Sequence, residues 1–80
     1  MKYPVYSIRD NKATSFSPPI VQVNEAVMKR DFEYRLHNDK AMGFAPSDYE
    51  LFQVGLFDVD TGVLESFPIP EFIVSGGELF

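Results

Sequence analysis

Two spacings of apolar side chains, every second and every fourth residue, divide the chain into strands and one helix. Residues 3–8 carry apolar groups at both parities, a pattern typical of a strand that is covered on both faces. A short second strand is expected at 20–23, after an extended, polyproline-like connection at 16–19. The longest strand is expected at 49–57, and 63–67 is predicted to return antiparallel beside it.

The segment 58–62 has the composition of a hairpin loop, and its glycine suits the positive-φ position of a bulged turn. After the returning strand, Pro68 and Pro70 are expected to end the ladder, because proline has no backbone N–H to donate. The chain is then predicted to be extended at 71–74 and to finish as a loose tail at 75–80.

The helix has the clearest signals in the sequence. Asn24 is a favoured N-cap, and no glycine or proline interrupts residues 25–38. Met28, Phe32 and Leu36 recur every four residues and therefore form one apolar stripe. We expect this stripe to face the sheet and form the centre of the core.

Other apolar residues are assigned to the core by their positions between or within these elements. Residues 40–48 are predicted to be a loop in which Met42 and Phe44 pack against the core. Phe52 and Phe57, on the longest strand, are also assigned to the core. The predicted fold class is α+β, a small antiparallel β-sheet of three to five strands with one α-helix packed on one face.

The length of 80 residues allows one domain, predicted to span residues 1–80. A chain of this size buries only about 60% of its unfolded surface, and without cysteine it has no disulfides to compensate. A homodimer is therefore expected. No apolar run is long enough for a membrane span and the N-terminus lacks a secretion signal, so no membrane association and a cytosolic location are predicted.

Charge is distributed unevenly along the chain. All seven lysine and arginine residues lie in the first forty positions, which have a net charge of +2, whereas the second forty have seven acids and a net charge of −7. One interpretation is a half that faces a polyanion and a half that repels it or regulates. The other is chance combined with helix pairing. The overall pI of about 4.6 argues against strong nonspecific duplex binding.

Several short runs resemble the small nonstructural protein of gokushovirus-type microviruses (Microviridae, Gokushovirinae), phages with single-stranded circular DNA. The similar segments span residues 1–67 and are Lys2-Tyr3, Val5-Tyr6-Ser7-Ile8, Asp10, Lys12-Ala13, Pro18-Pro19, Asp48-Tyr49-Glu50-Leu51-Phe52, Val54-Gly55, Phe57-Asp58 and Thr61-Gly62. The resemblance implies a DNA-binding protein that handles the genome in the host cytoplasm and is absent from the mature virion. Arg9 departs from the family, in which an aromatic residue is common there.

Enzyme chemistry lacks its parts in this sequence. The single histidine, His37, is expected to be a capping or surface residue at the helix end. The run 58–62 has its glycine at the wrong position for a calcium loop. No glycine-rich phosphate loop precedes a helix. We therefore expect no catalytic residue, no metal site and no cofactor.

Single-stranded DNA binding needs cations for phosphates and exposed rings on which bases stack. The first half of the chain supplies both, and alternation along the first strand places Tyr6 on one face and Tyr3 with Arg9 on the other. The candidate nucleic-acid-binding residues are Tyr3, Tyr6, Arg9, Lys12, Phe16, Lys29, Arg30, Tyr34 and Arg35. The function expected is non-catalytic binding of single-stranded viral DNA during genome replication or packaging.

Two other functions stay open. The protein is alternatively an adaptor or DNA mimic that acts on a viral or host replication protein through its acidic half, or an internal scaffold for capsid assembly. A single surface that contains all seven basic residues would favour DNA binding, and scattered basic residues would favour the adaptor. If DNA binds through those basic residues, the affinity for DNA is expected to fall steeply as the salt concentration rises.

Overall fold

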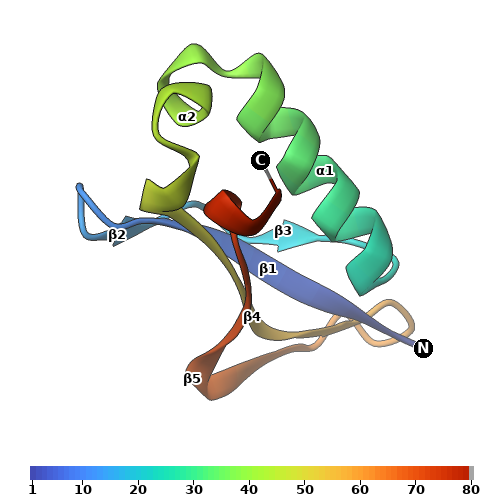
Figure 1. Ribbon diagram of the computed structural model, residues 1–80. Helices are drawn as coiled ribbons and strands as arrows, with labels where there is room; N and C mark the ends of the chain where they lie inside the picture. The colour runs from blue at the N-terminus through green and yellow to red at the C-terminus, as the bar shows by residue number, and fades with distance from the viewer. Residues whose placement is uncertain (80) are drawn as a thin grey trace.

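A computed structural model describes residues 1–79 and shows a strongly curved antiparallel sheet with a helix on one face (Figure 1). The strands run in the order β2-β1-β4-β5, and β3 pairs with β1 on the edge that it shares with β2. The α+β prediction is confirmed. The elements are β1 (Lys2–Asp10), β2 (Ser15–Phe16), β3 (Ile20–Val21), α1 (Glu25–Asn38), α2 (Lys40–Phe44), η1 (Pro46–Asp48), β4 (Tyr49–Asp58), β5 (Leu64–Ser75) and η2 (Gly76–Leu79).

The helix α1 forms as its sequence signals predict. The Asn24 side chain accepts a hydrogen bond from the Val27 backbone N–H at 2.8 Å and so caps the first turn. Met28, Phe32 and Leu36 are fully buried. Their four-residue spacing therefore places one face of α1 on the sheet, as expected.

Strand β1 lies in the middle of the sheet and contributes to both of its faces. Tyr6 and Ile8 point toward α1 and join the core with Leu51 of β4 and Val74 of β5. The alternate residues of β1, which include Arg9, face the other way. We call the side of the sheet opposite α1 the open face.

A β-bulge at Val54 changes which residues of β4 face the core. The pairing with β1 skips from Gly55 to Gln53 and leaves Val54 as the extra residue. Because a one-residue shift reverses the faces, Phe52 and Phe57 both lie on the open face and are only half-buried. Their assignment to the core from the sequence is wrong. Phe52 alternates with the buried Leu51, and Phe57 changes face because of a bulge that the alternation does not reveal.

Strand β5 is longer than the sequence predicts. Pro68 and Pro70 do not end it, because the ladder with β4 stops after Ser66 and resumes at Glu71. The four residues 67–70 between these pairs need no ladder hydrogen bonds, so the prolines are tolerated there. The strand bends sharply and forms a corner that projects away from α1 (Figure 1).

The segment 40–48 is more regular than the loop expected for it, since it forms α2 and η1. Met42 packs against the core as predicted. Phe44 does not: its side chain is 94% exposed, and the prediction that it packs in the core is wrong. No helix in residues 1–79 is long and apolar enough to cross a membrane.

The end of β5 continues into the short helix η2 on the same side of the sheet as α1 (Figure 1). Leu79 packs against the buried cluster, and a Cβ on Gly76 would lie 2.2 Å from the Pro46 carbonyl oxygen. The expectation of a loose tail at 75–80 is therefore corrected for 75–79, whereas Phe80 lies outside the described residues. Local composition suggested a free end, but contacts with distant segments hold it.

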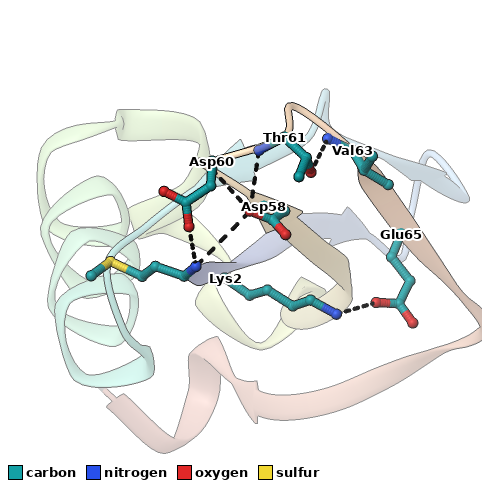
Figure 2. Close-up of polar contacts among 7 residues, drawn as sticks. Lys2, Asp58, Asp60, Thr61, Val63 and Glu65 are labelled. Atoms are coloured by element: carbon teal, nitrogen blue, oxygen red, sulfur yellow. Dashed lines mark hydrogen bonds and ion pairs between the residues drawn. The ribbon is translucent and has the colours of Figure 1, made fainter.

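Ion pairs connect the basic first half of the chain to the acidic second half. The Met1 amino group lies near the carboxylates of Asp58 and Asp60, and Lys2 Nζ lies 3.3 Å from Glu65 (Figure 2). Asp58 also accepts hydrogen bonds from backbone N–H groups of the hairpin loop, and these lower the pKa of its carboxyl group. Opposite charges thus meet across β1, β4 and β5.

Candidate nucleic-acid interface

Three phenylalanine rings form a row across the open face of the sheet. Phe16 of β2 meets Phe52 of β4 edge-to-face with ring centroids 5.4 Å apart, and Phe52 meets Phe72 of β5 in the same way at 5.7 Å. Phe16 and Phe72 are 42% and 48% exposed. We call these three residues the aromatic row.

The small side chain of Ser7 makes the row possible. Ser7 lies on β1 opposite Phe52, between the two outer strands that carry Phe16 and Phe72. Its hydroxyl donates to the Ser17 carbonyl oxygen at 2.7 Å, and the Ile8 N–H donates to the Ser17 hydroxyl at 2.9 Å. These bonds hold the segment that carries Phe16 against β1. The sequence did not predict a strand at Ser15–Phe16, where the structure has β2.

Arg9 supplies a positive charge at one end of the aromatic row. Its guanidinium carbon lies 5.2 Å from the centre of the Phe16 ring, and its Nε donates to the Asn11 side chain at 2.9 Å. Asn11 in turn donates to Glu50 at 2.9 Å. No carboxylate within residues 1–79 lies within ion-pair distance of Arg9. The Arg9 guanidinium is therefore available to an anion beside the Phe16 ring.

The other candidate cations do not form one groove with Arg9. Helix α1, across the sheet from the open face, carries Lys29, Arg30 and Arg35. The candidate ring Tyr34 is on the same helix. Three of the candidate cations are in ion pairs: Lys12 with Asp48 at 3.6 Å, Lys29 with Glu25 at 3.3 Å and Arg35 with Asp31 at 3.3 Å. Pairing lowers the phosphate affinity that these side chains offer.

Two candidate tyrosines differ sharply in accessibility. Tyr6 is 1% exposed beneath α1, where burial, assisted by Glu25 and Glu71, raises the pKa of its hydroxyl to about 12. Its ring is not accessible to a base. Tyr3 is half-buried on the open face, opposite Phe57.

Phe16 also borders a second region that contains predicted residues. A hollow of about 240 Å³ lies between β2 and α1, and a neighbouring hollow of about 490 Å³ shares Arg35 and Met42 with it. The first is lined by Ile8, Asp10, Ser15, Phe16, Ser17, Arg35, Met42 and Tyr49, and the second by Tyr34, Arg35, Asn38, Asp39 and Met42. Three predicted residues, Phe16, Tyr34 and Arg35, thus border adjoining hollows at the β2 edge.

Reasoning from the sequence missed two members of the aromatic row. Phe52 was assigned to the core and Phe72 received no role. One signal was present: Leu51 and Phe52 are adjacent on a strand, so only one of them can face α1. Nothing local indicates that Phe72 pairs with Phe52, because that register depends on the corner at 67–70.

The fold and this row define a small α+β protein with a helix on one side of its sheet and an exposed aromatic surface on the other. The sequence model of the phage ORF5 protein family matches residues 3–79, and the chain therefore belongs to this family. It is a phage protein. No curated protein and no solved structure matches it.

Proposed function

We propose that this phage protein is a non-catalytic, gokushovirus-type protein that binds single-stranded viral DNA by stacking bases on the aromatic row. The observation that carries the proposal is the row itself, with Arg9 over its first ring. The proposed setting is genome replication or packaging in the host cytoplasm, with the protein absent from the mature virion.

Stacking favours a single strand over a duplex. The faces of unpaired bases are free to lie on exposed rings, and each stacked base contributes roughly 1–3 kcal/mol. In a duplex the bases already stack on one another. The two outer rings of the row are each almost half exposed, so each offers a surface to a base.

The ion pairs change the salt dependence that is expected. The slope of log affinity against log salt is about 0.7 for each phosphate that a single strand loses to a cation. Among residues 1–79, Arg9 is the cation found over a ring of the row, and the net charge of the protein is −5. We therefore expect a shallow slope of about 0.7, in place of the steep slope predicted from the sequence.

Fluorescence anisotropy with a labelled oligo-dT tests this function. Phe72→Ala, which removes an exposed ring, is expected to weaken binding about 5- to 150-fold. Phe44→Ala is the matched control, because Phe44 is more exposed but lies outside the row, and it should bind like the wild type. Reversing the charges of Lys29, Arg30 and Arg35 should change affinity little.

Two results would reject the proposal. One is undetectable binding to oligo-dT at low salt. The other is equal binding by Phe72→Ala and Phe44→Ala, since the row would then have no part in the affinity. Loss of binding on charge reversal in α1 would instead return the site to the helix.

A second candidate function is an adaptor that acts on a viral or host replication protein. It is favoured by the pairing of four of the seven basic residues with carboxylates among residues 1–79, which leaves few cations for DNA. This function predicts no affinity for oligo-dT and a specific partner that co-purifies from infected cells and is lost on substitution of Phe72.

A further inference from the structure

The corner of β5 presents an exposed apolar side chain on a stiff support. Residues 67–70 lie outside the β4–β5 ladder, and Ile69 at their centre is 78% exposed. Pro68 and Pro70 flank it and fix their own φ angles, so little conformational freedom is left in this short segment. We call Ile69 with its two prolines the corner knob.

An apolar hollow lies on the open face, the side toward which the corner projects. It has a volume of about 170 Å³, close to the size of one large side chain. The register with β4 places Val5, Gly55 and Ser66 on this face together with Ser7 and Arg9. The lining residues are Val5, Pro19, Val54, Gly55, Leu64, Glu65 and Ser66.

We propose that the corner knob of one copy inserts into the hollow of a second copy, and that the protein is a two-fold homodimer joined through its open faces. A two-fold axis makes the contact twice, because each copy offers both a knob and a hollow. The occupant of the hollow is identified by its shape and chemistry. A rigid apolar projection and an apolar hollow of side-chain size occur on the same side of the same chain.

Among residues 1–79, five of the eleven exposed large apolar side chains lie where this contact would form. A standard interface takes about 800 Å² from each partner, about a sixth of the 5011 Å² surface of this protein. Exposed apolar side chains gathered on one face are typical of interaction sites. The large apolar residues exposed on the open face and at the corner are Phe16, Val21, Leu64, Ile69 and Phe72.

Charge also favours this face over the others. Two copies of a protein with a net charge of −5 repel each other, so they associate most easily through surfaces without net charge. Among the paired strand residues that face away from α1, the charged ones are Arg9 and Glu50, which lie opposite each other and have opposite signs. The open face is therefore close to neutral.

The first test is the oligomeric state of the full chain by sedimentation velocity over a wide range of concentrations. The wild type is expected to be dimeric, and Ile69→Asp is expected to raise the dimer dissociation constant about 100-fold or more, because a carboxylate would enter an apolar hollow. Phe44→Asp removes a more exposed apolar side chain on another part of the surface and should stay dimeric.

Cross-linking provides a second measurement. The chain has no cysteine, so Ile69→Cys and Ser66→Cys variants each carry a single thiol. A mixture of the two, one with a tag, should give a disulfide-linked heterodimer under mild oxidation, because Ser66 lines the hollow. Val23→Cys, also exposed, should not cross-link to Ser66→Cys.

The proposal is overturned by a monomeric wild type, by a dimer that Ile69→Asp leaves intact, or by equal cross-linking of the Ile69→Cys and Val23→Cys variants. The circular dichroism of each variant checks its folding, which is expected to survive because Ile69 and Ser66 are exposed. The inference does not rest on DNA binding, since all three measurements are made without DNA. Because the aromatic row lies on the same face, the dimer contact and a bound strand would compete for Phe16 and Phe72.

Discussion

At the residue scale, Phe32 and Phe44 show how far position decides the contribution of one side-chain type. Phe32 is fully buried against the sheet, and Phe44 is 94% exposed on α2. Phe32→Ala is expected to lower the free energy of unfolding by about 3–5 kcal/mol, through lost burial and the cavity left behind. Phe44→Ala should change it by less than about 0.5 kcal/mol. Urea unfolding of both variants measures the difference, and similar midpoints would contradict the assigned core.

Tyr6 gives the protein a specific alkaline weakness. Its pKa is about 12 in the folded protein and 10 without burial, so above pH 10 the unfolded chain loses this proton while the folded protein keeps it. Stability is therefore complete below pH 10 and falls as pH rises toward 12. Between pH 9 and pH 11 the wild type should lose about 1 kcal/mol more than Tyr6→Phe, measured by urea unfolding. Equal losses would mean that Tyr6 ionises freely.

Alternation along a strand was a reliable guide only up to the first irregularity. It separated Tyr6 and Ile8 from Arg9 correctly, because the extra residue in the β1–β4 pairing, Val54, lies on β4 and not on β1. It failed on Phe57 because the bulge at Val54 reverses the faces of β4. A bulge depends on how two strands pair, and that information is not contained in either strand alone.

At the element scale, α1 was predictable because its signals are local. An N-cap, an uninterrupted run and a four-residue stripe all lie within one segment, and the structure agrees with each of them. Strand β5 was not, because its two prolines read locally as an end to the ladder, whereas the pairing with β4 resumes beyond them. The aromatic row needs three strands in register, and only Phe16 and the adjacent Arg9 were identified from the sequence.

Two glycines in the β4–β5 hairpin are expected to respond differently to substitution. A Cβ on Gly55 would lie 2.2 Å from the Glu65 carbonyl oxygen, so Gly55→Ala must push two paired strands apart and should cost about 3 kcal/mol. Gly62 has φ of +77° and open space around it, and asparagine tolerates that conformation. Gly62→Asn should cost less than about 1 kcal/mol by thermal unfolding. The reverse order of the two effects would contradict the strand pairing.

At the scale of the whole molecule, the charge asymmetry of the sequence does not produce a basic half and an acidic half in space. The sheet order places β1, from the basic half, directly beside β4 from the acidic half. Lys2 and Lys12 pair with Glu65 and Asp48 as a result. The seven basic residues lie close together in the sequence, but they do not line one groove, since the topology distributes them over two sides of the sheet.

The C-terminal turn η2 closes the core, so its removal should be felt globally. Deleting residues 76–80 exposes apolar surface that Leu79 covers in the buried cluster and is expected to lower the free energy of unfolding by about 1–2 kcal/mol. Leu79→Ala should reproduce most of this loss. Unchanged thermal stability after the deletion would show that the tail is free, as its composition first suggested.

Because β5 and η2 complete the core, the order of synthesis on the ribosome affects when the core can form. Met28, Phe32 and Leu36, which form the apolar face of α1, are translated well before Val74 and Leu79. Those two residues pack against the same cluster. At a synthesis rate of about 5–20 residues per second, several seconds pass between the translation of α1 and that of the residues that cover its apolar face. During that interval its apolar face is expected to be exposed.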